Sequence, residues 1–269
     1  MTTQFLKTSE GTIAYDDVGS GQVILCVPGV GDLRQEYRLL NPHLVKAGYR
    51  VVMMDVRGHG ESSTGWSDYS MVSISKDILA LIDHLNVGRV IIAGASISAG
   101  SAVWIAAEHP DIVAGLLLLG PAVSDSPMPA YMTALVHVMF APLWGVFSWG
   151  MYYNTLFPTN KPADFVTYRQ KLLANLREPG RLNALRGLVF TSHKPSAERA
   201  ARVNVPTFIV MGTKDPDFKD PKAEAQWLAE QTHGKVMMVD GAGHYPHVEM
   251  IDQVAQPTIN FLESIKVTS

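Results

Sequence analysis

Short apolar runs alternate with amphipathic segments along most of this chain. Between the runs, apolar residues recur at helical spacing, as at Ile74, Ile78, Leu81 and Leu85, and a further helix is expected over residues 221–231. The runs are rich in β-branched and aliphatic residues, which is typical of buried strands; they cover residues 12–16, 22–27, 50–55, 90–94, 113–119, 207–211 and 235–239. Strands that alternate with helices predict an α/β fold, with a mostly parallel sheet and helices on both of its faces.

Two shorter patterns add local detail. Gly19-Ser20-Gly21 separates the first two apolar runs and is a hairpin-type turn signal. Tyr37, Leu40 and Leu44 would share one face of a helix, which is expected to end at Ala47-Gly48.

The alternation of strands and helices stops between residues 121 and 203. It resumes after residue 203, so this region interrupts a single α/β unit and does not end it. We therefore expect a core domain made of residues 1–120 and 204–269, with an inserted helical lid over residues 121–203.

The first half of this insertion carries almost no charge. No Asp, Glu, Lys or Arg occurs between Asp125 and Lys161. A transmembrane helix needs about 20 apolar residues, but Pro142, Gly145 and Gly150 interrupt the stretch, so no integral membrane span is expected. An apolar inner wall of the lid would give an apolar substrate pocket. Its candidate lining residues are Met139, Trp144, Phe147 and Tyr245.

Composition excludes several classes of protein. The chain has 269 residues and a net charge of −3, which gives no basic surface for nucleic acid. Cys26 is the single cysteine, so an internal disulfide or a multi-cysteine metal site is excluded, and its apolar neighbours predict a buried, inert thiol. The N-terminal residues lack the layout of a signal peptide, so a cytoplasmic protein is expected.

A serine follows the strand expected at residues 90–94. In Gly94-Ala95-Ser96-Ile97-Ser98 the chain must turn sharply from a strand into a helix, and only small neighbours allow that turn. Such a turn lifts a serine hydroxyl clear of the sheet, as in a nucleophile elbow. Ser96 is the candidate nucleophile. Ser98 is an alternative nucleophile, and a helix cap is an alternative role for either serine.

A serine nucleophile needs a histidine base and a carboxylate that orients it. Asp215 follows the strand at 207–211, and His244 lies in a glycine-flanked loop after the last strand. The order Ser, Asp, His is that of an α/β-hydrolase. Asp125 and Asp217 are rival acids, although Asp217 fits a turn or helix-capping role better.

Three further histidine and carboxylate positions have other expected roles. His247 and Glu249 follow His244, but no third ligand cluster accompanies them and Pro246 interrupts a helical spacing, so no zinc site is expected. His59 lies between two glycines, which predicts a structural role in a tight turn.

These motifs together resemble the lid-bearing α/β-hydrolases. The resemblance is carried by Pro28-Gly29-Val30-Gly31, the loop 55–62, the Ser96 turn, Asp215, and Gly243-His244 with the Glu249 that follows. It implies that the backbone N–H groups of Val30 and Ile97 form the oxyanion hole. The chain departs from the family pattern twice, with Pro28 where a histidine is frequent and Ser98 where the elbow usually has glycine.

The function expected from these residues is hydrolysis of a small-molecule ester with an apolar acyl group of small to medium size. Ser96 would attack the carbonyl, with rate rising with pH through about 6–7 as His244 loses its proton. No cofactor or metal is expected, and the sequence leaves the oligomeric state open. Lactonase, perhydrolase, acyltransferase and carbon–carbon bond hydrolase activities use the same triad, and a receptor that retains it is a further alternative. Dehalogenases and epoxide hydrolases need a carboxylate nucleophile, which Ser96 does not provide.

Overall fold

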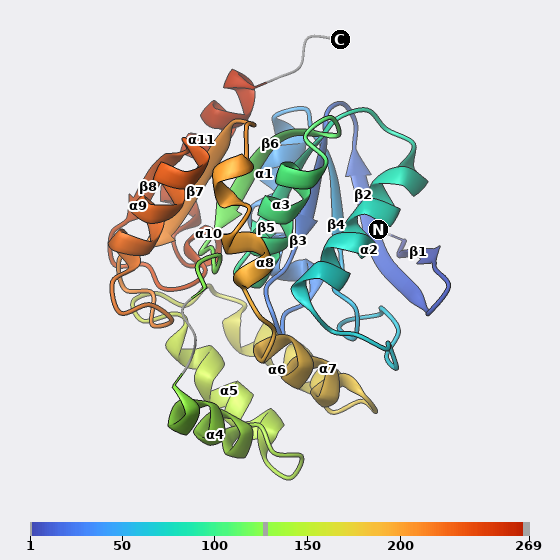
Figure 1. The fold of residues 1–269 in the computed structure, drawn as a ribbon, viewed down its shortest axis with the longest axis vertical. Helices are drawn as coiled ribbons and strands as arrows, with labels where there is room; N and C mark the ends of the chain where they lie inside the picture. The colour runs from blue at the N-terminus through green and yellow to red at the C-terminus, as the bar shows by residue number, and fades with distance from the viewer. Residues whose placement is uncertain (1, 126–128, 266–269) are drawn as a thin grey trace.

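A central sheet of eight strands organises the molecule, in the order β1-β2-β4-β3-β5-β6-β7-β8 (Figure 1). The computed structural model describes residues 2–125 and 129–265. All neighbours from β4 to β8 pair in parallel, and β2 is antiparallel to both β1 and β4. The strands are β1 (Gln4–Lys7), β2 (Thr12–Gly19), β3 (Val23–Val27), β4 (Arg50–Met54), β5 (Val90–Ala95), β6 (Val113–Leu119), β7 (Thr207–Gly212) and β8 (Lys235–Val239). The mostly parallel sheet predicted from the sequence is confirmed.

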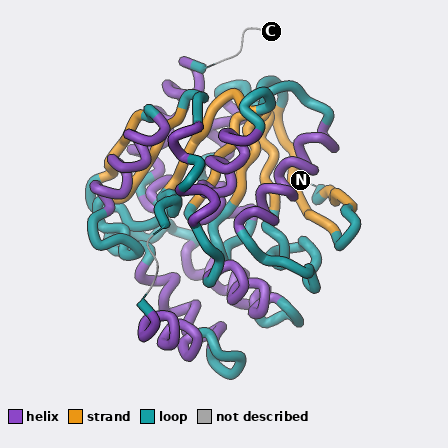
Figure 2. The backbone as a smooth tube through the Cα atoms, viewed as in Figure 1, coloured by secondary structure: helices purple, strands orange, loops and turns teal. Residues whose placement is uncertain are grey.

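Helices cover both faces of this sheet (Figure 2). One face packs against α2 (Met71–Leu85), α3 (Ile97–Glu108) and α9 (Pro221–Thr232). The other face packs against α1 (Asn41–Lys46) and α11 (Ile251–Ser264). The strand side chains alternate between these two cores, as in β3, whose Leu25 joins the first core and whose Cys26 joins the second. Cys26 is completely buried, as predicted.

The predicted hairpin between the first two apolar runs is wrong. β2 does not pair with β3, because β4 lies between them: Met53 of β4 is paired with Asp16 of β2 on one side and with Cys26 of β3 on the other. The chain between β3 and β4 crosses over through the 3-10 helix η1 (Arg34–Arg38) and α1, which is the usual connection of parallel strands. A turn signal shows where the chain reverses and does not determine which strands pair. Here the crossover between β3 and β4 determines the pairing, because it places β4 between β2 and β3.

Other elements differ from the sequence prediction in smaller ways. The predicted helix over Tyr37, Leu40 and Leu44 is divided into η1 and α1. The strand β1 and the helices α10 (Pro246–Glu249) and α11 were not predicted. α11 contains Pro257 in its interior, which weakens the sequence signal for a helix there.

In the described residues between β6 and β7, every regular element is a helix. They gather beyond one end of the sheet, in the lower part of Figure 1. This helical insertion comprises α4 (Ala130–Met139), α5 (Gly145–Thr155), α6 (Phe165–Leu176), α7 (Arg181–Val189), α8 (Lys194–Ala197) and the 3-10 helix η2 (Ala200–Arg202). In the described residues, no helix is long and apolar enough to cross a membrane.

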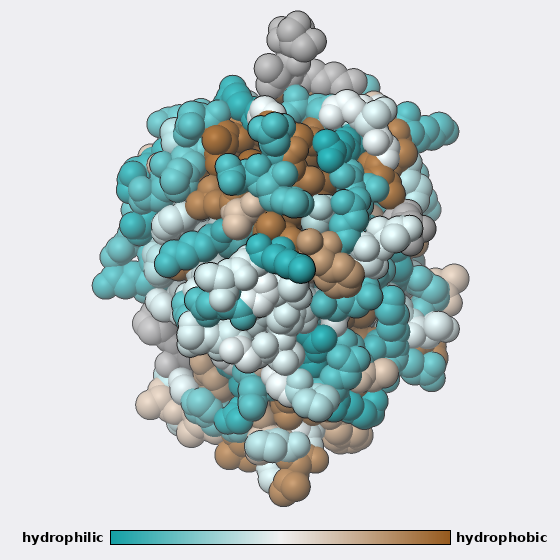
Figure 3. Space-filling model, turned by 90° about the vertical axis from the view of Figure 1, so that its right-hand side faces the viewer, coloured by the Kyte–Doolittle hydropathy of each residue, from teal (hydrophilic) through white to brown (hydrophobic). Residues whose placement is uncertain are grey.

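The first helix of the insertion is unusually apolar on its outer side. α4 has no buried residue, and its Tyr131, Leu135 and Val138 are 74%, 53% and 58% exposed. Hydrophobic side chains are visible at this lower end of the molecule in Figure 3. α5 and α6 are packed differently, since Trp149, Tyr153 and Tyr168 are buried in a third apolar cluster.

A buried carboxyl joins the insertion to the core. Asp32 lies in the loop after β3 and is completely buried. Its Oδ2 accepts a hydrogen bond from the Tyr153 hydroxyl of α5 at 3.0 Å, and its Oδ1 accepts one from the Tyr168 hydroxyl of α6. Burial is the main reason that the pKa of Asp32 rises to about 7. Two helices of the insertion are thereby tied to one side chain of the core.

Candidate active site

Ser96 occupies the turn between β5 and α3. Its backbone has φ 52° and ψ −122°, a conformation that a residue with a side chain rarely adopts. The turn is held from two sides, because Ser96 N donates to Leu119 O at 3.0 Å and Ser96 O accepts from Ala122 N at 3.1 Å. The strained strand-to-helix turn expected at this serine is present.

Asp215 and His244 are directly hydrogen-bonded. The distance between His244 Nδ1 and Asp215 Oδ2 is 2.8 Å, and both side chains are at most 2% exposed. The other oxygen of Asp215 accepts the backbone N–H of Asp217 at 3.0 Å, which fixes the carboxylate. Because a carboxylate only accepts, Nδ1 carries a proton, and in the neutral form of the ring Nε2 is left with a lone pair.

The Ser96 turn and the His244 loop meet at the end of β6. Ser96 is bonded to Leu119, and the next residue, Gly120, lies against His244. A Cβ at position 120 would stand 2.2 Å from the carbonyl oxygen of His244, and Gly120 has φ +51°. Only glycine allows this approach. The carboxyl ends of β5, β6, β7 and β8 thus bring Ser96, Asp215 and His244 to one edge of the sheet.

A second carboxylate faces the same imidazole. Asp217 Oδ2 is 3.6 Å from His244 Nδ1, and Asp217 Oδ1 accepts a hydrogen bond from the Tyr152 hydroxyl of α5. Burial is the largest influence on Asp217 and raises its pKa. Asp215 is the nearer partner of His244, and Asp217 lies next to the pair without replacing it.

These charges determine the proton affinity of His244. Burial tends to lower the pKa of His244, since it penalises the imidazolium. The negative charges of Asp215 and Asp217 outweigh burial and, with a smaller contribution from Glu36, raise that pKa to about 9. The value of 6–7 expected from the sequence took no account of a second carboxylate beside the ring.

Ser98, the alternative nucleophile, and Asp125, an alternative acid, form no hydrogen bond with His244 in the part of the chain that the structure describes. Ser98 is completely buried, and its hydroxyl donates to the carbonyl oxygen of Pro28 at 2.6 Å. Asp125 is exposed. His244 has Asp215, and not Asp125, as its hydrogen-bond partner.

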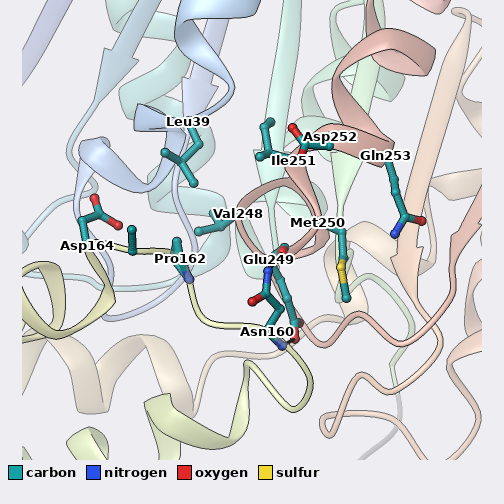
Figure 4. Close-up of a pocket in the computed structure, with 11 residues that line it drawn as sticks. Leu39, Asn160, Pro162, Asp164, Val248, Glu249, Met250, Ile251, Asp252 and Gln253 are labelled. Carbon is teal, nitrogen blue, oxygen red and sulfur yellow. Dashed lines mark hydrogen bonds between the residues drawn. The ribbon is translucent and has the colours of Figure 1, made fainter.

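His247 and Glu249 are engaged elsewhere in the protein. His247 Nε2 pairs with Glu36 Oε1 at 3.0 Å. Glu249 Oε2 accepts the N–H of Gly243 at 2.6 Å and Oε1 accepts the N–H of Asn160 at 2.7 Å, so Glu249 braces the loop that carries His244. Figure 4 shows Glu249 and Asn160 side by side, at a surface hollow of about 480 Å³.

One cluster of potential metal ligands occurs in residues 2–125 and 129–265. Asp215, Asp217 and His244 each offer an atom, and these atoms lie within 4.8 Å of one another. A cation here would have to displace the Nδ1 proton that His244 shares with Asp215. The donors therefore match a proton-transfer pair better than a resident cation.

A cavity of about 770 Å³ opens beside Ser96. Val30 and Ile97, the expected oxyanion-hole residues, line it together with Ser96. The wall contributed by the insertion is largely apolar and consists of Met132, Val136, Met139, Phe140, Trp149, Tyr152, Leu188 and Val189. The polar lining residues are Ser124, His193, Asp217, Lys219, Asp220 and Glu224, which come from the insertion and from the chain after β7. The cavity therefore offers both apolar and polar contacts to a ligand.

The structure changes the list of pocket residues. Met139 lines the cavity as expected. Trp144 and Phe147 do not: they are 44% and 66% exposed and border a separate hollow of about 430 Å³ on the outside of the insertion. Tyr245 is only 2% exposed and packs edge-on against the His244 ring, with 5.0 Å between ring centroids, and it is not among the residues that line the cavity.

Helix geometry explains this correction. Trp149 and Tyr152 are three residues apart on α5, so they share the face that looks into the cavity. Phe147 is two residues before Trp149 and points away from that face. Apolar composition alone did not identify the inward face, because both faces of α5 are apolar.

The comparison with known families agrees with this fold. A family model described as the alpha/beta hydrolase fold matches residues 22–250. The chain belongs to the α/β-hydrolase family. Among curated relatives of this α/β-hydrolase is 2-hydroxy-6-oxo-6-phenylhexa-2,4-dienoate hydrolase of Comamonas testosteroni, 28% identical over 52% of this chain and 54% of that enzyme. Matches to several curated relatives span between 34% and 54% of the relatives' own length.

Solved structures show the same fold over nearly the whole chain. A bromoperoxidase from Bacillus anthracis superimposes with a TM-score of 0.84 and 19% identity, over 97% of this chain and 100% of that one. An esterase from Exiguobacterium antarcticum superimposes with a TM-score of 0.83 and 19% identity, over the same shares of the two chains. At this identity the likeness establishes the α/β-hydrolase fold alone. These relatives are hydrolases or share a hydrolase fold, so an enzyme is expected.

Proposed function

We propose that this α/β-hydrolase cleaves carboxylic esters through Ser96, His244 and Asp215. The observation that carries the proposal is the 2.8 Å contact between His244 and Asp215 at the same sheet edge as a serine in a strained turn. That serine lines a large cavity, so a substrate carbonyl can approach it. We assign the remaining role, a pair of oxyanion donors, to the backbone N–H groups of Val30 and Ile97, which line the cavity together with Ser96.

The proposed reaction follows from the hydrogen bonds of the site. His244 Nδ1 is occupied by Asp215, so Nε2 accepts the Ser96 proton as Oγ attacks the ester carbonyl carbon. The carbonyl oxygen becomes negative and is stabilised by the Val30 and Ile97 amides, each worth roughly 10²–10³ in turnover. The carbon–oxygen bond of the ester then breaks, and His244 protonates the departing alcohol. Water releases the acyl group from Ser96 in the same two steps.

The apolar and polar residues that line the cavity suggest how an ester binds in it. We assign the acyl chain to the apolar lining residues of α4, α5 and α7, and the alcohol to polar lining residues such as His193 and Lys219. In this proposal residues 121–203 act as a lid over a core formed by residues 1–120 and 204–269. The preferred substrates are then small to medium apolar acyl esters.

A panel of p-nitrophenyl esters, from acetate to dodecanoate, tests this proposal. We expect kcat/KM to rise with chain length up to medium chains, because each buried methylene adds about 0.8 kcal/mol of binding. An organophosphonate is expected to add once, at Ser96, as mapped by peptide mass spectrometry. The assignment would be contradicted if none of the esters were cleaved, or if the adduct formed at another residue.

Carbon–carbon bond hydrolysis is the second candidate. It is favoured by one observation, the 28% identity over about half of the chain to the Comamonas hydrolase that acts on a dienoate. A vinylogous 1,5-diketone is therefore included in the same assay. Faster turnover of this compound than of any ester would favour the second candidate, and the same triad would then serve it.

The pH dependence of the reaction follows from the charges around His244. The base must be neutral to accept the Ser96 proton, and its pKa is raised to about 9. We expect kcat/KM to increase about tenfold per pH unit below this value and to level off above it. Initial rates with a neutral ester between about pH 6 and pH 10 measure the midpoint. A plateau that already begins near pH 7 would contradict the influence of the two carboxylates.

A further inference from the structure

The backbone on both sides of Val30 is held by buried side chains. Gly29 N donates to Glu36 Oε2 at 2.8 Å, and Gly31 N donates to His59 Nε2 at 3.2 Å. In the described part of the chain, the N–H of Val30 itself donates no hydrogen bond. The loop thus uses the amides next to Val30 as anchors and leaves one amide for a ligand in the cavity.

Glu36 is a carboxyl-bearing residue that is buried next to Gly29. It is 1% exposed, and burial is the main reason that its pKa rises to about 8. Burying a carboxyl is costly unless it is hydrogen-bonded, and Glu36 uses both oxygens: Oε2 holds Gly29 and Oε1 pairs with His247 at 3.0 Å. His247 is completely buried, so both members of the pair are shielded from solvent. None of these contacts belongs to the catalytic triad.

His59 is suited to hold the other side of Val30. Its Nδ1 is 3.2 Å from the carbonyl oxygen of Arg57, so Nδ1 carries the proton and Nε2 accepts from Gly31. Burial lowers the pKa of His59 to about 4, which keeps Nε2 an acceptor at neutral pH. Gly31 has φ +69°, and a Cβ there would stand 2.3 Å from the Trp149 ring, so the loop has no freedom to shift toward the insertion.

The two departures from the family pattern contact each other. The Ser98 hydroxyl donates to the carbonyl oxygen of Pro28 at 2.6 Å. Ser98 lies on α3, directly after Ile97, whereas Pro28 begins the loop that carries Val30. This hydrogen bond therefore fixes the distance between the two elements that supply the oxyanion donors.

We propose that Glu36 is a positioning residue of the oxyanion hole. By anchoring Gly29, Glu36 orients the Val30 N–H toward the substrate carbonyl oxygen. His59 anchors Gly31 on the other side in the same way, and His247 keeps the Glu36 carboxyl in place. The inference rests on the proposed ester hydrolysis, since it assigns Val30 as an oxyanion donor. Glu36 itself touches neither substrate nor triad.

The test compares Glu36→Ala with Glu36→Gln. Glutamine retains an oxygen that accepts from Gly29 and an amide group that reaches His247, so it is the conservative variant. We expect Glu36→Ala to lower kcat about 10–100-fold and to change KM less than about threefold, because the lost interaction forms only with the developing oxyanion. We expect Glu36→Gln to restore kcat to within about threefold of the wild type.

Binding of a trifluoromethyl ketone gives a second readout. This inhibitor forms a tetrahedral oxyanion on Ser96, so its affinity for Glu36→Ala is expected to fall in proportion to kcat/KM. Active-site titration with an organophosphonate counts the folded enzyme, and kcat is expressed per titrated site. A residue with only a structural role would lower the titrated fraction and leave kcat per site and inhibitor affinity unchanged, which would overturn the proposal.

A milder variant covers the case in which Glu36→Ala does not fold. Glu36→Asp withdraws the carboxyl by one methylene, so it no longer spans from Gly29 to His247, and kcat is expected to fall at least about fivefold. Wild-type kcat in soluble Glu36→Asp would overturn the proposal. If Ser96→Ala is inactive while Glu36 variants keep full kcat, only the inference about Glu36 fails. An active Ser96→Ala variant would instead remove the proposed function.

Discussion

Alanine in place of Ser96 is expected to lower kcat/KM for an ester by about 10⁴-fold or more, because no other hydroxyl occupies the strained turn. Substrate binding relies on the cavity walls, so KM or inhibitor affinity is expected to change little. Steady-state assays on the best ester of the panel measure both quantities. The folded state of the variant is checked by its thermal midpoint, which is expected to stay the same or to rise, because alanine removes a buried hydroxyl from a strained position.

Ser98→Ala is the matched comparison for that variant. It removes the hydrogen bond to Pro28 and is expected to lower kcat by about tenfold, since the oxyanion loop is then less firmly held. A larger loss in Ser98→Ala than in Ser96→Ala would transfer the nucleophile to residue 98. The organophosphonate adduct distinguishes the two serines independently of rates.

Asparagine in place of Asp215 is expected to lower kcat by about 10³–10⁴-fold, because the amide favours the wrong tautomer of His244. In the wild type the carboxylate holds the Nδ1 proton at 2.8 Å and stabilises the imidazolium that forms during attack. The amide can present its NH₂ group to Nδ1, which would place the proton on Nε2 and block it as a base. Single-turnover rates with an activated ester measure the loss in the chemical step.

Asp217→Asn provides the contrasting result. Its oxygen is 3.6 Å from His244, so its loss is expected to reduce kcat by less than about tenfold and to shift the midpoint of the pH profile downward. Equal losses in Asp215→Asn and Asp217→Asn would show that the two carboxylates act as one unit. A large loss in Asp217→Asn alone would reverse the assignment of the acid.

The sequence predicts the strands and the chain order of the site because both depend on short-range patterns. Apolar runs mark β5, β6 and β7, and in a parallel sheet their carboxyl ends meet at one edge. Residues placed just beyond those ends, such as Ser96 and Asp215, must therefore lie near each other. Small residues around Ser96 identify the turn for the same local reason.

Long-range choices could not be predicted from these patterns. The pairing of β2 with β4 depends on a crossover, and the inward face of α5 depends on where the insertion lies over the sheet. Glu36 reads as an ordinary surface charge in the segment Arg34-Gln35-Glu36-Tyr37-Arg38. Its burial against Gly29 and His247 comes from residues 7 and 211 positions away along the chain, which no local signal reveals.

The attachment of α5 and α6 to Asp32 determines which helix of the insertion can move. Displacing either helix would remove one tyrosine hydroxyl from the buried carboxyl of Asp32. The loop that carries Val30 and Asp32 would then shift as well. α4 has no buried residue, yet its Met132, Val136 and Met139 line the cavity. Displacing α4 alone would therefore widen the cavity and leave both hydrogen bonds to Asp32 intact.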